Sequence, residues 1–240
     1  MQHYFIKQNS ALNERISFDS EQSHHILRVL RMGNNDKVCV LTTDNKKFIV
    51  SLEIENNTTY GRCIEEIESE VKQVNIVLVL ALIKKDKWDF AIQKAAELQA
   101  TKVVPLITER TVVKVNEERT DKQLLRWNKI ALEASEQSQR FSLCTVEPPI
   151  EIKKIKDYFQ DINVVAYEKS DNGNHISKYL SKGKSVLVVI GPEGGFSNSE
   201  IACMKDLGLQ PCSLGRSILR AETASMYALS AVNYVNEEIR

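Results

Sequence analysis

The sequence has no net charge and no apolar run long enough to cross a bilayer. Lys plus Arg and Asp plus Glu number 32 each in 240 residues, which argues against a broadly basic nucleic-acid-binding surface but not against a local basic patch. The longest apolar run, Ile76–Ile83, is far shorter than the roughly 20 residues that a membrane helix needs. No signal peptide opens the chain, so we expect a cytoplasmic protein.

Several binding motifs are missing as well. No metal-ligand pattern surrounds His24 and His25, so we expect no metal site. The glycine loop GPEGG at 191–195 does not match GxGxxG and lacks GK[ST], which leaves a dinucleotide site and a Walker-type phosphate loop unsupported there. The cysteines form no CxxC pair and mostly lie in apolar runs, which favours buried reduced thiols at Cys39, Cys63, Cys144, Cys203 and Cys212.

The residues that are present predict two domains. The 42% hydrophobic fraction is ample for a core. Residues 1–70 carry short β-branched segments between polar turns, which predicts a small β-barrel. Residues 71–240 alternate strands with helices, which predicts an α/β domain with a largely parallel sheet covered on both faces. We place the boundary in the charged segment 66–73.

Periodicity predicts the individual elements. In the first domain we expect a helix at Glu21–Leu30 and strands at Lys37–Leu41, Phe48–Ile54 and Tyr60–Ile64. In the second, we expect strands at Val74–Ile83, Val103–Ile107, Ile162–Tyr167 and Val186–Ile190. Pro105 favours an edge or irregular strand. We expect helices at Asp86–Gln99, Arg119–Arg140, Ile150–Phe159, Ile176–Leu180 and Asn198–Leu207, and a last helix from Glu222.

Two glycine loops mark the expected site. The apolar runs Val186–Ile190 and Gln210–Leu214 each lead into such a loop, the first with Gly191, Gly194 and Gly195, the second with Gly215. A strand that ends in a glycine turn before a helix is where α/β proteins place ligands. Ser197 and Glu200 have the spacing of a capping box, so a helix should begin after the first loop. We therefore expect one site with two walls.

The second loop suggests what this site could hold. The apolar residues Ile218 and Leu219 could flank a flat aromatic ring, whose edge could bond the main chain. Arg220 and Glu222 stand at the expected helix start. Glu222 also suits the positive end of a helix dipole, a role that needs no ligand.

The first domain carries a local set of basic residues. Arg28 and Arg31 are three apart and would share a helical face, where they could contact phosphates together. A solvated helix face is the alternative. The candidate RNA-binding residues are Lys7, His24, Arg28 and Arg31.

Longer segments resemble a known family. GPEGGFSNSE followed by LGRSILRAETA resembles the cofactor loops of the ribosomal RNA small subunit methyltransferase E family, of the SPOUT class. HHILRVLRMGNNDKV, ALIKKDKWDFAIQKAAELQATKVVPLITERT and EQSQR resemble further segments of that family, so the likeness covers nearly the whole chain. The chain departs from the family at Asn35, where glycine is usual, and at Gln99–Ala100, which affects local turns.

This resemblance implies a fold and a reaction. The fold would be a PUA-like barrel followed by an α/β domain tied in a trefoil knot, which periodicity alone would not suggest. The reaction would methylate N3 of one uridine in 16S ribosomal RNA, with S-adenosyl-L-methionine as the methyl donor. The implied cofactor residues are Tyr167, Glu168, Ile190, Gly191, Pro192, Glu193, Gly194, Gly195, Leu214, Gly215, Ser217, Ile218, Leu219, Thr223 and Ala224.

The chemistry of this reaction suggests catalytic candidates. Uracil N3 carries a proton at neutral pH, so a base or a charge stabiliser must assist its removal. Arg220 or Arg140 could stabilise the developing anion, and Glu222 could act as the base or orient the arginine. A methyltransferase for another nucleotide, or a non-catalytic RNA-binding protein that uses the barrel alone, remain alternatives.

The last helix suggests a partner. Small residues recur along one face at Ala221, Ala224, Ala228, Ala231 and Val235, so another backbone could approach closely. The chain's own sheet could fill that place. The family resemblance favours a homodimer with the knot at its interface, in which Arg140 could come from the other chain.

Overall fold

The computed structural model describes residues 1–68, 74–111, 117–170 and 172–236. The chain forms two compact units. The first comprises Met1–Val71 with Ser135–Leu143, and the second comprises Lys72–Ala134 with Cys144–Arg240. The domain boundary expected after residue 70 lies outside the described residues.

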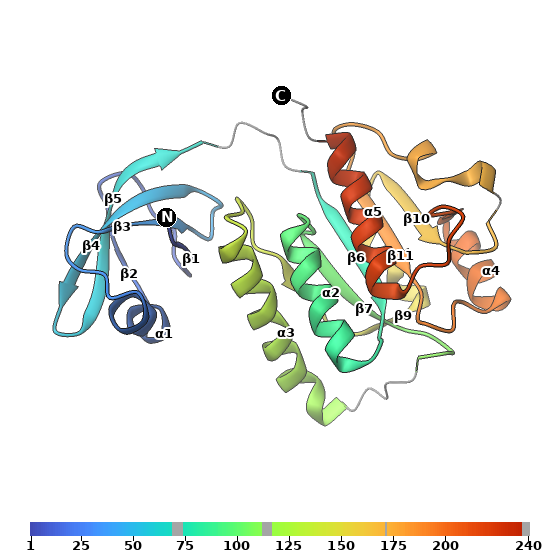
Figure 1. Ribbon diagram of the computed structural model, residues 1–240, viewed down its shortest axis with the longest axis horizontal. Helices are drawn as coiled ribbons and strands as arrows, with labels where there is room; N and C mark the ends of the chain where they lie inside the picture. Colours follow the sequence, from blue (N-terminus) through green and yellow to red (C-terminus); the bar gives the residue numbers. More distant parts are fainter. Residues whose placement is uncertain (69–73, 112–116, 171, 237–240) are drawn as a thin grey trace. The chain divides into compact units, whose positions relative to one another are not determined.

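The first unit is built on a five-stranded sheet in the order β1-β3-β4-β5-β2 (Figure 1). The predicted strands are found as β3 (Lys37–Leu41), β4 (Lys47–Glu55) and β5 (Thr58–Ile67). Two short strands were not predicted, because three residues are too few to show a period; they are β1 (His3–Phe5) and β2 (Arg15–Ser17).

The segment Ser135–Leu143 was not expected in this unit. Lys47, buried within the unit, donates from Nζ to the carbonyl of Gln139 at 2.9 Å and lies 3.9 Å from the centre of the Phe141 ring. The amide of Phe5 donates to Glu136 Oε1 at 3.1 Å. No local sequence pattern predicts these interactions, because they join residues about a hundred positions apart in the chain.

The predicted helix at Glu21–Leu30 is shorter and changes its winding. An α-helix, α1 (Ser20–His24), starts at a capping box formed by Asp19 and Gln22 and continues as a π-helix, η1 (His25–Val29). Arg31 lies beyond the helix with φ 55°, in the left-handed region. The expectation that Arg28 and Arg31 share a helical face is therefore wrong, because the chain turns between them.

The second unit contains a parallel sheet in the order β12-β10-β11-β6-β7-β8, with β9 also paired to β7. Every strand pair described in it is parallel. The strands are β6 (Ile76–Ala81), β7 (Lys102–Ile107), β8 (Thr145–Val146), β9 (Ile150–Glu151), β10 (Ile162–Ala166), β11 (Val186–Ile190) and β12 (Gln210–Cys212). The helices are α2 (Lys85–Glu97), α3 (Glu117–Gln137), α4 (Asn198–Leu207) and α5 (Ala221–Asn236), with 3₁₀ turns η2 (Ile152–Tyr158), η3 (Asn172–Asn174) and η4 (Ile176–Lys178).

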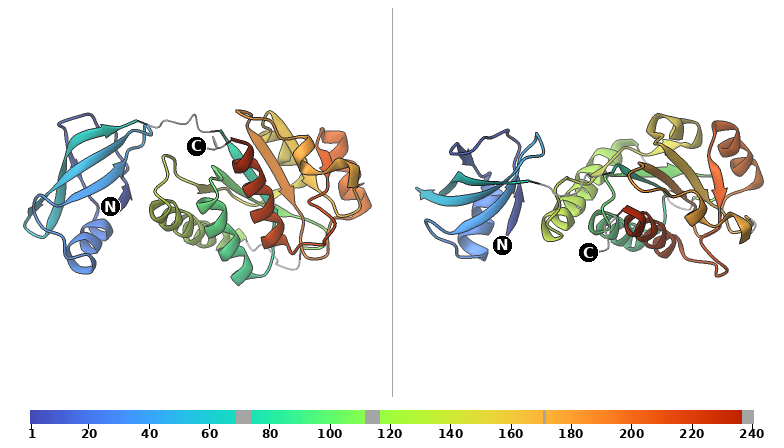
Figure 2. Two further views of the ribbon diagram at one scale, coloured as in Figure 1. Left: turned by 45° about the horizontal axis from the view of Figure 1, so that its top comes forward. Right: turned by 90° about the horizontal axis from the view of Figure 1, so that it is seen from above.

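Helices cover both faces of this sheet, as predicted. Along β6, Leu78 and Leu80 enter the core shared with α2, α3 and α5, while Val77 and Val79 enter the core shared with α4 and η2. Figure 2 shows α2 and α5 on one side of the strands and α4 on the other. The continuous apolar run was the right signal, because a strand buried on both faces needs no alternation.

Two predicted elements in this unit differ from the structure. β7 is not an edge strand, since it pairs with β6 on one side and with β8 and β9 on the other. Pro105 is tolerated because it lies between the registers of these two short partners, where no ladder bond is needed. The helix expected at Ile150–Phe159 is β9 followed by the 3₁₀ turn η2.

Two positions where the chain departs from the family pattern have left-handed backbone. Asn35 has φ 68° and Gln99, directly after the end of α2, has φ 66°. Asparagine adopts this region more readily than other non-glycine residues. Gln99 adopts it at a cost of roughly 1–2 kcal/mol relative to glycine.

The alanine stripe of α5 packs within its own chain. Ala221, Ala224 and Ala228 are buried in the core shared with α2 and the sheet. The small residues thus allow α5 to approach α2 and the sheet of its own chain, which is the alternative stated above, and the homodimer stays a prediction. Tyr227 and Tyr234, on the other side of α5, are 41% and 71% exposed.

Candidate functional site

The site lies at the carboxyl edge of the parallel sheet, where the chain leaves β10, β11 and β12. Because neighbouring parallel strands end at the same edge, loops distant in sequence meet there. They enclose a pocket of about 390 Å³. This volume falls within the range of small-molecule sites.

The first loop, residues 191–197, is held by its own chain. Gly195 has φ +66°, and a Cβ there would lie 3.3 Å from Glu168 Oε1. A Cβ on Gly191 would meet the buried Phe196 ring at 3.0 Å. Arg110, in the turn after β7, donates from Nη1 to the carbonyl of Gly194 at 2.5 Å. The glycines therefore permit a close approach of backbone to side chains.

The helix after this loop begins as predicted. Ser197 and Glu200 form a capping box, and α4 ends at Gly208 with φ 110°. The Glu200 carboxylate is buried and also accepts from the amide of Glu109 at 2.8 Å. This acid thus ties the start of α4 to the turn after β7.

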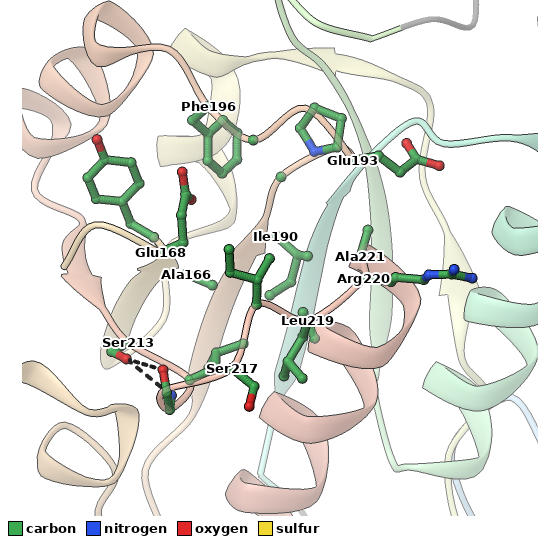
Figure 3. Close-up of a pocket in the computed structure, with 18 of the residues that line it drawn as sticks. Ala166, Glu168, Ile190, Glu193, Phe196, Ser213, Ser217, Leu219, Arg220 and Ala221 are labelled. Atoms are coloured by element: carbon green, nitrogen blue, oxygen red, sulfur yellow. Dashed lines mark hydrogen bonds between the residues drawn. The ribbon is translucent and has the colours of Figure 1, made fainter. Parts of the chain in front are cut away.

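The second loop, residues 214–220, is far more open. Ser213 Oγ is bonded to both backbone groups of Gly215 at 3.1 Å (Figure 3). Gly215 has φ 120° with nothing near its Cβ position, and Ile218 is 87% exposed. Leu219 is partly buried against the core, next to Ile190 in the pocket.

Most residues predicted to hold a cofactor line this pocket. Of the predicted set, Thr223 alone does not; the others are lining residues. Arg216 and Ala221 also line the pocket and lie within the predicted segment 214–224. Sequence reasoning missed three more lining residues, because they lie just outside the predicted segments: Ala166, Phe196 and Ser213. Their position directly after a strand or beside a predicted residue was the available signal.

Of the three predicted catalytic residues, Arg220 lines the pocket and the other two do not. Arg220 lines the pocket and is exposed, with its side chain directed away from the centre (Figure 3). Glu222, in the first turn of α5, lies beside Lys87 rather than beside an arginine, with 3.7 Å between Oε1 and Nζ. Arg140 is buried in the first unit, where Nη2 donates to Ser142 Oγ at 3.2 Å, and does not line the pocket.

Lys87 was missed by the sequence analysis. Its Nζ lies 3.5 Å from Glu193 Oε1 as well as near Glu222, so one lysine of α2 meets an acid of the first pocket loop and an acid of α5. It lies in the segment ALIKKDKWDF, which resembles a family segment, but the sequence does not show what its side chain faces. Only the position of β6 beside β11 brings it to these loops.

The cysteines are free thiols, as predicted, and all but Cys203 are buried. Burial raises the pKa of the Cys212 thiol to about 12, which disfavours the reactive thiolate form. Within the described residues, no group of His, Cys, Asp or Glu side chains could hold a metal ion. None of the helices described here is long and apolar enough to cross a membrane.

The candidate RNA-binding residues all lie on the first unit. Lys7, His24, Arg28 and Arg31 are exposed there. His24 is the last residue of α1, and Arg28 lies in η1. The surface therefore presents these side chains to solvent, as a phosphate-binding role requires.

Comparison with known proteins identifies the class. A family profile described as an RNA methyltransferase domain matches residues 70–233, and one described as an RNA methyltransferase PUA domain matches residues 18–58. The parallel sheet with its pocket is the methyltransferase domain of the SPOUT class, and the first unit is its PUA-like domain, so the predicted fold class is confirmed.

The chain belongs to the ribosomal RNA small subunit methyltransferase E family. It is 35% identical to the Bacillus subtilis protein of that name, over 100% of this chain and 99% of the other, and 32% identical to the Rickettsia conorii one, over 95% and 93%. Its fold matches the Neisseria gonorrhoeae enzyme bound to S-adenosyl methionine with TM-score 0.88, 25% identity and 98% coverage of both chains. A Legionella pneumophila putative methyltransferase with the same bound cofactor matches at TM-score 0.87 and 27% identity, over 99% and 98%.

Proposed function

We propose that this enzyme transfers a methyl group from S-adenosyl-L-methionine to N3 of uridine 1498 in 16S ribosomal RNA. The observation that carries the proposal is the pocket built from the two glycine loops at the carboxyl edge of the sheet. Relatives of this chain are named as small-subunit ribosomal RNA methyltransferases, and two solved structures hold the same cofactor.

The residues of the pocket suit this cofactor. Ile190, Leu214 and Leu219 provide an apolar lining for the adenine ring. The carboxylates of Glu168 and Glu193 line the same pocket and complement the cationic amino and sulfonium groups. The space beside Gly195, which a Cβ would narrow, lets a ligand approach the backbone. When bound, the cofactor supplies an electrophilic methyl group.

The protein's own part in the reaction is to position the uracil and stabilise its charge. As N3 loses its proton, negative charge spreads to O2 and O4, where a cation lowers the barrier. Arg220 lines the pocket, and its exposed guanidinium would have to turn from the direction seen in Figure 3 to take this role. Arg140 is less suited, because its side chain is buried in the first unit.

The first unit and α5 provide for RNA and for assembly. We propose that Lys7, His24, Arg28 and Arg31 contact RNA phosphates, and that the enzyme works as a cytoplasmic homodimer. Because the alanine stripe is used within the chain, the exposed Tyr227 and Tyr234 are the residues to test. Tyr234→Glu should convert a dimer into monomers in light scattering; a monomeric wild-type protein with full activity would refute the dimer.

Primer extension on ribosomal RNA tests the proposed reaction. A methyl group on N3 blocks the pairing edge, so reverse transcriptase should stop at the modified uridine in wild-type RNA and read through in a deletion strain. Restoring the gene should restore the stop. A stop at another nucleotide would indicate a different target. No stop that depends on the gene, together with no cofactor binding in calorimetry, would favour a non-catalytic RNA-binding protein.

A further inference from the structure

Lys87 occupies an unusual position at the start of α2. It lies in the first turn, where the positive end of the helix dipole disfavours cations by roughly 0.3–1 kcal/mol. The helix has no side-chain cap at Lys84 to compensate. The helix dipole therefore does not favour a lysine here, whereas the acids that its side chain faces do.

Its ammonium group faces two carboxylates, that of Glu193 in the first pocket loop and that of Glu222 in the first turn of α5. Nζ is 3.5 Å from Glu193 Oε1 and 3.7 Å from Glu222 Oε1, and the Lys87 side chain is 31% exposed. These are ion pairs without hydrogen bonds among the described residues, so the three N–H donors of Lys87 remain available. A partly exposed ammonium next to Glu193, which lines the pocket, can meet a substrate group.

Glu222 is suited to hold this lysine in place. Its side chain is 13% exposed, and Oε2 is buried with no hydrogen-bond partner among the described residues. A carboxylate in this setting is costly unless a cation lies close to it. Since Oε2 is buried, the acid is placed to orient a cation rather than to take a proton from a substrate.

We propose that Lys87 is a catalytic residue that donates to O2 or O4 of the target uracil, with Glu222 as its positioning residue. This proposal rests on the methyl transfer to uracil N3 proposed above. The N3–H bond breaks and its proton passes to water. The electron pair left on N3 then forms the bond to the methyl carbon. The bond between the methyl carbon and sulfur breaks, and sulfur keeps the electron pair of that bond. Lys87 stays protonated throughout and stabilises the negative oxygen.

Steady-state kinetics of purified variants test the role of Lys87. The substrate is small ribosomal subunits from a deletion strain, with radiolabelled methyl donor. Lys87→Met should lower kcat about 100-fold, the effect of removing one such donor. The dissociation constant for S-adenosyl-L-methionine, measured by calorimetry without RNA, should stay within about two-fold, and Lys87→Arg should retain more activity than Lys87→Met, because it keeps the charge.

Two further variants separate catalysis from folding. Lys94→Met on the same helix removes an ion pair with Glu97 at 2.7 Å and should leave kcat unchanged. Lys87→Met leaves the Glu222 carboxylate without its cation, so its melting temperature should fall. The double variant Lys87→Met/Glu222→Gln should recover the melting temperature but not kcat.

Three results would overturn this role. They are a kcat for Lys87→Met within about three-fold of wild type, equal reductions of kcat in the Met and Arg variants, or a fall in cofactor affinity that accounts for the fall in rate. If wild-type protein transfers no methyl group to the subunits, the proposed function fails instead, and this result is separate from the three above.

Discussion

In the first pocket loop, residues 191–197, the chain's own groups surround the backbone, whereas the second loop, residues 214–220, lies open to solvent. The first loop packs the Phe196 ring against Gly191 and receives a hydrogen bond from Arg110. In the second, Ile218 is almost fully exposed and Gly215 has no neighbour at its Cβ position. The two loops that line one pocket thus differ in how far they are packed against groups of their own chain.

The difference shows which of the two loops is preorganised for ligand binding. A loop fixed by its own chain has already lost its conformational entropy during folding, so it binds without that cost. An exposed loop with a large apolar side chain gains its burial from whatever binds later. We expect mutations in the first loop to act through the shape of the pocket, and mutations in the second to act only when a ligand is present.

Gly195→Val should have the largest effect on binding. Valine would be strained at φ +66°, and its Cβ would crowd Glu168 Oε1. We expect the affinity for S-adenosyl-L-methionine, measured by calorimetry, to fall at least about 100-fold while the fold survives. Gly183→Val is the matched control, because Gly183 has φ +75° but open space around it; it should lose stability without losing affinity. Wild-type affinity in Gly195→Val would contradict the account of the first wall.

Phe196→Ala should weaken both the fold and the pocket. Removing this buried ring should cost about 3 kcal/mol of unfolding free energy in denaturant titrations. We expect a further drop of roughly ten-fold in cofactor affinity, because the backbone at Gly191 loses its support. Ile201→Ala removes a side chain from the same cluster away from the pocket, and it should lower stability only. Equal reductions of affinity in both variants would mean that Phe196 acts through stability alone.

Ile218→Ser should leave the stability of the free protein unchanged and should affect only ligand binding. Because the side chain is exposed, the free protein should change stability by less than about 0.5 kcal/mol. Burial of an isoleucine side chain by a ligand contributes about 1–2 kcal/mol to the binding free energy, so the cofactor affinity of the variant should be lower by about five-fold or more. Leu125→Ser, at a similarly exposed site on α3, should change neither quantity. Unchanged affinity for the cofactor would show that something else covers the second wall.

Arg28→Ala with Arg31→Ala should have the smallest effect and should extend the comparison to the first unit. These exposed cations should contribute to RNA binding but not to cofactor binding. The slope of log affinity against log salt should become shallower by roughly 0.7–0.9 for each phosphate that the variant no longer neutralises. Lys46→Ala with Arg62→Ala removes equal charge from the same unit and should leave the slope intact. A slope unaltered in the first variant would make Arg28 and Arg31 part of a solvated surface.

Local patterns predicted much of the fold. The strand at 186–190, the capping box at Ser197 and Glu200, and the helix end at Gly208 were all predicted and are confirmed. They depend on residues within one or two turns of each other, which a sequence displays directly. The errors at Arg31, Pro105 and Ile150–Phe159 arose where the neighbour that decides the conformation is distant in sequence or the element is very short.

The sequence by itself determined where the loops of the site begin and end, because glycines, caps and apolar runs act locally. The tertiary structure decided which groups meet there. Lys87, Glu193 and Glu222 come together only because β6 pairs with β11 and α5 packs on α2. In the same way, only the packed chain shows that the alanines of α5 face α2. Strand order and helix packing are properties of the whole chain, since they minimise exposed apolar surface over all elements at once.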